Sequence, residues 1–94
     1  MARRRRRTKA DNLRSHARRL AAERFDLTLT RHDFRIIVQR IQERRCLACF
    51  RQSNTRSIHR MTYRNHLMDV VYHHRYKMVV TFMYPFDPFS RKEQ

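Results

Sequence analysis

Residues 69–82 read DVVYHHRYKMVVTF, and this stretch decides the fold. Two apolar runs, 70–72 and 78–82, flank a short polar and basic break. Runs rich in β-branched and aromatic residues, separated by such a break, are typical of two strands joined as a hairpin. We therefore predict that these two runs form an antiparallel hairpin at the centre of a sheet.

The strand pattern extends backwards from this hairpin. Segments rich in Val, Ile, Phe, Tyr, Met and Thr lie at residues 46–52, 57–64, 67–73 and 77–84. Short polar breaks separate them, which predicts a four-stranded antiparallel meander. Because the chain contains no glycine, we expect its connections to be longer than the two-residue hairpin turns that favour glycine. Pro85 and Pro88 should end the sheet.

Two helices are predicted ahead of the strands. Asp11 is a candidate N-cap for the first, which should end near Phe25. Its apolar residues recur at helical spacing and are Leu13, Ala17, Leu20 and Ala21. Thr30 and Asp33 resemble a capping box at the start of the second helix. The apolar stripe of that helix consists of Phe34, Ile37, Val38 and Ile41.

Two helices followed by four strands predict an α+β domain, in which the N-terminal helices pack on one face of a four-stranded antiparallel sheet. We assign residues 11–85 to this single domain. Residues 1–10 contain the block RRRRR, and such like-charge runs stay disordered until they meet a polyanion. Residues 1–10 are therefore predicted to be a flexible arginine-rich arm, and residues 86–94 a C-terminal tail.

The net charge of the chain indicates which class of molecule it binds. The 94 residues include 23 Lys and Arg against 8 Asp and Glu, a formal net charge of +15. Arginine dominates, and its planar guanidinium matches phosphate and stacks on bases, so nucleic acid is the expected partner. An anionic membrane surface is the other partner that such charge permits, but we favour nucleic acid and expect no membrane partner. No apolar run approaches the length of about 18 residues that a membrane span needs, so no transmembrane span is expected. With only two cysteines, we expect a reducing, cytoplasmic setting.

The basic residues that should contact phosphate lie in both parts of the chain. In the arm and the first helix they are Arg3, Arg4, Arg5, Arg6, Arg7, Lys9, Arg14, Arg18 and Arg19. In the domain we add Arg60 and Lys77, together with Tyr72, whose ring either stacks on a base or belongs to the core. An arginine-rich segment of this kind also resembles the helices with which phage antitermination proteins grip an RNA hairpin.

Four stretches carry a further resemblance. They are LTRHDFRII at residues 29–37, FRQS at 50–53, IHRM at 58–61 and the hairpin at 69–82. Together, over residues 29–85, they resemble small phage-encoded proteins with the compact ribonuclease fold of barnase, colicin D and the RelE-type toxins. This resemblance implies action on RNA in the cytoplasm of a bacterial host. Some members of these families cleave RNA without a metal, through its 2′-hydroxyl, and others bind RNA or ribosomes without cutting.

Such cleavage needs a base, an acid and cations that face the phosphate. His59, inside the second strand, is the first candidate for acid or base. His32 is the rival, because it lies in the first turn of the second helix. Arg75 at the hairpin tip is a candidate phosphate ligand, as is Arg60. The resemblance adds the hydroxyl of Thr81. For each residue the alternative is an ordinary polar position in a basic protein.

A metal site is the remaining alternative for the cysteines. Cys46 and Cys49, with His59 and His66, imitate a zinc ligand set. The spacing differs from that of common zinc fingers, and a three-residue offset on a strand points two thiols to opposite faces. We therefore expect no metal and no cofactor.

Three functions fit these observations. The first, which we favour, is an RNA-binding protein that docks on structured RNA, on the ribosome or on an RNA polymerase complex, and modulates the host. The second is a metal-independent endoribonuclease of the toxin type. The third is a DNA-binding regulator, which charge alone permits.

Overall fold

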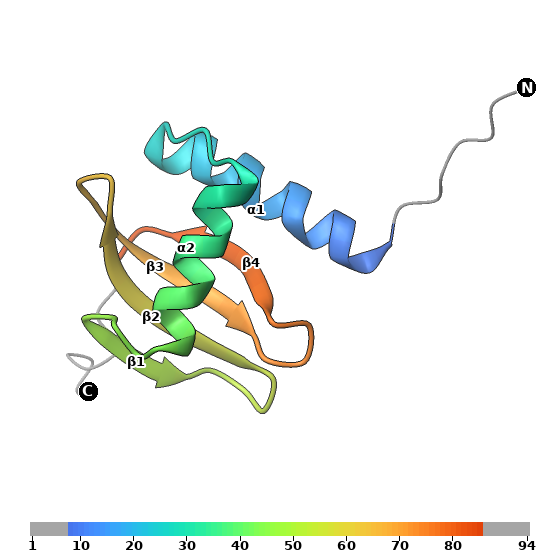
Figure 1. Cartoon of the computed structure of the whole chain (residues 1–94), viewed down its shortest axis with the longest axis vertical. Helices are drawn as coiled ribbons and strands as arrows, with labels where there is room; N and C mark the ends of the chain where they lie inside the picture. The colour runs from blue at the N-terminus through green and yellow to red at the C-terminus, as the bar shows by residue number, and fades with distance from the viewer. Residues whose placement is uncertain (1–7, 86–94) are drawn as a thin grey trace, which may run out of the picture.

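A computed structural model describes residues 8–85 of the chain. It confirms the α+β class, with two helices followed by a four-stranded antiparallel sheet (Figure 1). The elements are α1 Lys9–Phe25, α2 Arg31–Gln42, β1 Ala48–Arg51, β2 Arg56–Tyr63, β3 His66–His73 and β4 Met78–Met83. The strand order β1-β2-β3-β4 is that of the predicted meander.

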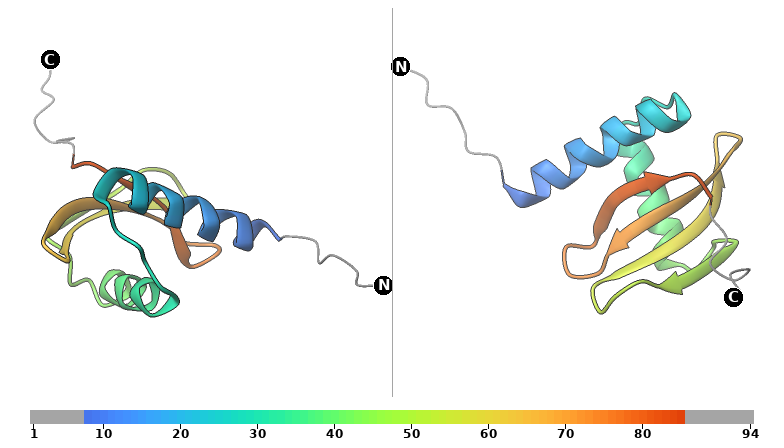
Figure 2. Two further views of the ribbon diagram at one scale, coloured as in Figure 1. Left: turned by 90° about the horizontal axis from the view of Figure 1, so that it is seen from above. Right: turned by 180° about the vertical axis from the view of Figure 1, so that it is seen from behind.

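The predicted hairpin forms, but it does not lie at the centre of the sheet. β4 pairs with β3 alone and is an edge strand. Helix α1 lies along this edge, while α2 crosses one face of the sheet (Figure 2). The Arg24 guanidinium of α1 donates to the Phe82 carbonyl of β4 at 2.7 Å. An exposed strand edge invites pairing with other chains, and α1 covers this one.

The start of α1 differs from the prediction. Thr8, and not Asp11, is the N-cap, and the helix begins at Lys9, inside the segment assigned to the arm. The Thr8 hydroxyl accepts from the Asp11 N–H at 3.1 Å, and the Asp11 carboxylate accepts from the Thr8 N–H at 3.2 Å. This reciprocal capping box satisfies two amides that the helix itself leaves unpaired. The rest of the predicted arm, residues 1–7, and the predicted tail, residues 86–94, lie outside the described residues.

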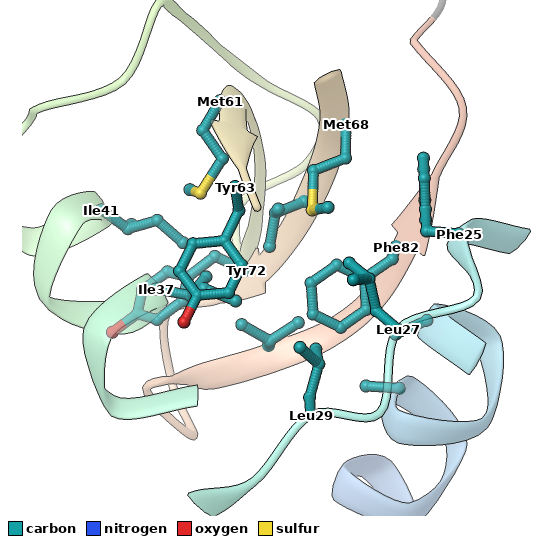
Figure 3. Packing of buried hydrophobic residues seen from close by; sticks show 14 residues of the cluster. Phe25, Leu27, Leu29, Ile37, Ile41, Met61, Tyr63, Met68, Tyr72 and Phe82 are labelled. Carbon is teal, nitrogen blue, oxygen red and sulfur yellow. The ribbon is translucent and has the colours of Figure 1, made fainter. Parts of the chain in front are cut away.

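The main core lies between α2, α1 and one face of the sheet (Figure 3). Phe82, Met68 and Val70 of the sheet are fully buried against Ile37 of α2. The predicted stripe of α2 is confirmed, because Ile37 and Ile41 are buried and its other two members pack on the same cluster. A smaller cluster lies on the other face of the sheet and consists of Ile58, Val71 and Val80. The alternation of strand side chains thus divides the sheet into two faces.

The turn between β2 and β3 overturns the expectation of long connections. Tyr63 pairs with His66, so the loop contains only Arg64 and Asn65. Both have positive φ, 51° and 67°, as the tight type I′ hairpin turn requires. Asparagine tolerates this conformation well, and the Arg64 side chain is held by an ion pair with Asp33. Contacts elsewhere in the fold therefore support a turn that usually uses glycine.

Asp33 joins the N-terminus of α2 to this turn. It forms the predicted capping box, in which its carboxylate accepts from the Thr30 N–H at 2.8 Å. The same carboxylate also accepts from the Tyr63 hydroxyl and from the Arg64 guanidinium. Burial by itself would raise the pKa of Asp33, but these hydrogen bonds and the Arg64 charge lower the pKa from 3.8 to about 2.

Replacing Asp33 should therefore change acid stability. Since the folded pKa of about 2 is below the ordinary 3.8, the ionised carboxylate stabilises the fold above pH 4. That stabilisation, about 2 kcal/mol, is lost as the pH falls through the folded pKa. In Asp33→Asn this component of the acid dependence of the free energy of unfolding should disappear. Urea unfolding at a series of pH values measures it, and an acid dependence equal to that of the wild type would contradict the assignment.

Candidate nucleic-acid interface

A cleft of about 680 Å³ opens beside the C-terminal end of α2. It lies on the α2 side of the sheet, over β1, β2 and the end of β3. Ser57 and His59 are alternate residues of β2, and Tyr72 of β3 pairs with Ser57. The register therefore directs these three side chains to the same face. The full lining is Ile41, Gln42, Arg44, Cys46, Ala48, Cys49, Arg51, Ser57, His59, Tyr72, His74 and Lys77.

Ser57 links two histidines in this cleft. Its Oγ lies 2.7 Å from Nε2 of His59 and 2.7 Å from Nε2 of His74. A serine hydroxyl has one hydrogen to donate and lone pairs with which to accept. If both contacts are hydrogen bonds, Ser57 donates to at most one of the two nitrogens, and at least one ring donates its Nε2–H to Ser57. The arrangement therefore suits one neutral acceptor ring beside one donor ring.

The two rings are held by Tyr72. Its ring is nearly perpendicular to both, with centroids 6.1 Å from His59 and 5.2 Å from His74. The Gln42 amide, at the end of α2, donates to the Tyr72 hydroxyl at 3.2 Å. Tyr72 is only 4% exposed. Of the two roles predicted for it, the core position is confirmed, and its burial leaves no open ring face on which a base can stack.

His59 is the buried member of the pair, with 6% of its surface exposed. Burial lowers its pKa, and the nearby charge of His74 lowers the pKa further. The ring is therefore neutral at pH 7, which is the form that a general base needs. His74 is exposed. One histidine of the cleft is therefore buried and the other is exposed to solvent.

Three cations line the cleft together with the histidines. Arg44, Arg51 and Lys77 line the cleft, and its lining, within residues 8–85, includes no Asp or Glu. Two of these cations occupy unusual backbone conformations, with φ of 59° at Arg44 and 53° at Lys77. Arg44 follows the C-terminal end of α2 and Lys77 lies in the turn before β4, and both are places where the left-handed conformation is common. The described lining of the cleft therefore carries positive charge and no carboxylate.

The two cysteines also line this cleft. Burial raises the pKa of the Cys46 thiol, which therefore stays protonated, and its Sγ lies 3.9 Å from the Arg40 carbonyl. Within the described part of the chain, no three His, Cys, Asp or Glu residues are arranged to hold a metal ion. The zinc set considered from the sequence, which included His66, is not assembled there.

The other predicted catalytic residues lie elsewhere. His32 and Arg75 are exposed, and neither lines the cleft. Arg60 follows His59 directly and so points to the opposite face, where it forms a bidentate ion pair with Asp69 at 2.8 and 3.1 Å. Thr81 pairs with Val71, which belongs to that same opposite face. The predicted set is therefore not brought together around His59.

The basic residues predicted on α1 have varied surroundings. The Lys9 ammonium lies 5.8 Å from the centroid of the Tyr76 ring. Arg14 and Arg19 form ion pairs within the helix, at 3.7 Å to Asp11 and 3.9 Å to Glu23. The Arg18 guanidinium lies 5.5 Å from the Phe34 ring centroid. The predicted phosphate ligands Arg3, Arg4, Arg5, Arg6 and Arg7 lie outside the described residues.

Sequence reasoning missed Ser57, His74, Arg44 and Arg51. The sequence did contain one signal for two of these residues. Ser57 and His59 are two positions apart in one predicted strand, and Tyr72 and His74 are two positions apart at the end of the next. Alternate residues share a face, so the pairing of these two strands would have placed the four side chains together. The two arginines carried no such signal, because the chain is rich in arginine throughout.

Comparison of the chain with protein family models, with curated proteins and with solved structures found no match. Within residues 8–85, neither helix has the length and apolar character required to cross a membrane.

The pairing of the two histidines predicts a change in titration. Since the charge of His74 contributes to the lowered pKa of His59, His74→Gln should raise the pKa of His59, although burial should still hold it below the ordinary 6.5. NMR titration of the imidazole protons measures this shift. His32→Gln, at a histidine outside the cleft, is the matched control and should leave His59 unchanged. Equal titration of His59 in all three proteins would contradict the coupling.

Proposed function

We propose that this protein binds RNA and that the cleft beside α2 holds part of the RNA phosphate backbone. The observation that carries the proposal is the lining of the cleft. Three cations, Arg44, Arg51 and Lys77, line the same cleft as the two histidines that contact Ser57, and no carboxylate lies among the described lining residues. Arginine and lysine neutralise phosphates, and the accompanying release of counterions supplies much of the affinity of proteins for nucleic acid.

RNA is favoured over duplex DNA by the form of the site. A cleft of about 680 Å³ accepts an unpaired nucleotide, whereas duplex DNA is read by elements that enter its grooves. Proteins recognise RNA mostly at loops and unpaired ends, whose bases leave the stack, and the 2′-hydroxyl distinguishes RNA from DNA. The exposed ring of His74 is a suitable partner for that hydroxyl, because an imidazole can both donate and accept.

The cellular setting of the proposal rests on the resemblance stated above. We propose a phage-encoded protein in the cytoplasm of a bacterial host. Its RNA would be a structured RNA with unpaired loops, free or within the ribosome or an RNA polymerase complex, and its binding would modulate the host.

Binding is tested by fluorescence anisotropy with RNA and DNA oligonucleotides of the same sequence. RNA should bind more tightly than DNA. Arg51→Ala and Lys77→Ala should each flatten the slope of log K against log salt by roughly 0.7 for a single strand. Arg56→Ala removes the same charge from an exposed position outside the cleft and is the control. Equal affinity for DNA, or equal slopes in all variants, would contradict the proposal.

Metal-independent RNA cleavage is the second candidate, and the Ser57 bridge between His59 and His74 favours it. In this reaction neutral His59 accepts the proton of a 2′-hydroxyl, whose oxygen forms a bond to the adjacent phosphorus. The bond from phosphorus to the 5′-oxygen breaks, and protonated His74 donates a proton to the leaving oxygen. The products are a 2′,3′-cyclic phosphate and a 5′-hydroxyl. Arg44 and Arg51 would offset the charge that develops on the phosphate.

Incubation with single-stranded RNA in the presence of EDTA tests this reaction. Cleavage should yield cyclic phosphate ends. His59→Ala and His74→Ala should each lower the rate by about 10²-fold or more, as expected for loss of a general acid or base. His32→Ala should cleave like the wild type. RNA that is bound but stays intact would exclude the nuclease and leave the RNA-binding function in place.

A further inference from the structure

A second, smaller cleft of about 270 Å³ lies where α1, α2 and the start of β4 meet. Its charged lining comes from three separate segments, with Arg14 on α1, Arg31 and Arg35 on α2, and Lys77 just before β4. Phe34, Val38, Met78 and Val79 complete the lining. The site therefore combines four cations with an apolar floor.

The charge of this cleft is only partly neutralised. Arg14 forms an ion pair with Asp11 at 3.7 Å. Arg31, Arg35 and Lys77 are exposed, and no Asp or Glu lines the cleft within residues 8–85. Arg18 lies beside it, with its guanidinium 5.5 Å from the centroid of the Phe34 ring. A group with negative charge and an apolar part, such as a nucleotide, fits this combination.

Lys77 connects the two clefts, because its side chain lines both. It stands in the β3–β4 connection with φ of 53°, a conformation that is costly for a residue other than glycine. The two clefts therefore have one cation in common. At about 270 Å³, the second cleft is near the lower limit of about 300 Å³ for ligand pockets, which suits a subsite for one nucleotide.

We propose that the two clefts form one continuous track for unpaired RNA, in which the first cleft holds the dinucleotide beside His59 and the second cleft holds the next nucleotide of the strand. This inference rests on the proposed RNA-binding function. The track accounts for Arg31 and Arg35 of α2, which do not line the first cleft and are not part of the predicted arm. The length of RNA that fills this track is therefore more than one nucleotide.

The test measures affinity by anisotropy for unmodified single-stranded RNAs of increasing length, and gel electrophoresis after each titration checks that the RNA is intact. For the wild type, affinity should rise from a dinucleotide to the oligomer that fills both clefts. In the Arg31→Ala/Arg35→Ala double variant this gain should be lost, and the salt slope for the longer RNA should fall by roughly 1.4, since two phosphate contacts are removed. Affinity for the dinucleotide should be unchanged.

Two further variants make the result specific. Arg31→Lys/Arg35→Lys keeps both charges and should preserve the slope. Arg45→Ala/Arg56→Ala removes two exposed arginines that line neither cleft, and the gain with length should persist. If the Arg31→Ala/Arg35→Ala variant behaves like the wild type while Arg51→Ala still weakens binding, the track is wrong and the first cleft stands. If the wild type does not bind RNA of any length, the proposed function fails with it.

Discussion

The register of β2 against β3 is the constraint on which the rest of the structure depends. Eight residue pairs, from Arg56–His73 to Tyr63–His66, hold the two strands together. A slip of one residue would move every side chain of a strand to the other face. It would exchange Met61 and Tyr63 of the core for polar neighbours, and it would remove Ser57 and His59 from Tyr72. The hydrophobic core and the cleft that contains His59 and His74 therefore require the same register of β2 against β3.

Asp33 helps to maintain that alignment, because it connects α2 to the β2–β3 turn through Tyr63 and Arg64. One buried carboxylate caps a helix, accepts a hydrogen bond from a strand and holds a turn that has no glycine. A network of this kind is favourable only while every member is satisfied. The position of α2, and with it the place of Gln42 beside Tyr72, depends on this network.

Periodicity in the sequence was sufficient for much of the fold. Apolar residues at helical spacing after Thr30 predicted α2, and alternating apolar runs predicted four strands whose ends agree with the structure to within a few residues. Two of the wrong predictions, the start of α1 and the length of the β2–β3 turn, concern short polar segments that have no hydrophobic periodicity. Thr8 and Asp11 are both residue types that can cap a helix, so the spacing of polar residues alone did not distinguish them, and Thr8 is the N-cap in the structure. Arg64 and Asn65 formed a tight turn because Asp33, far away in the sequence, stabilises it.

The sequence by itself determined the α+β class, the strong positive charge and His59 as a candidate, because composition and spacing are local properties of the chain. Only the tertiary structure decided which groups meet. Ser57 and His74 are 17 residues apart, and pairing of two strands brings them together. The same folding placed Arg60 and Thr81 on the opposite face, away from His59. Lys77 gained its position between two clefts only through the packing of α1 and α2 around β4.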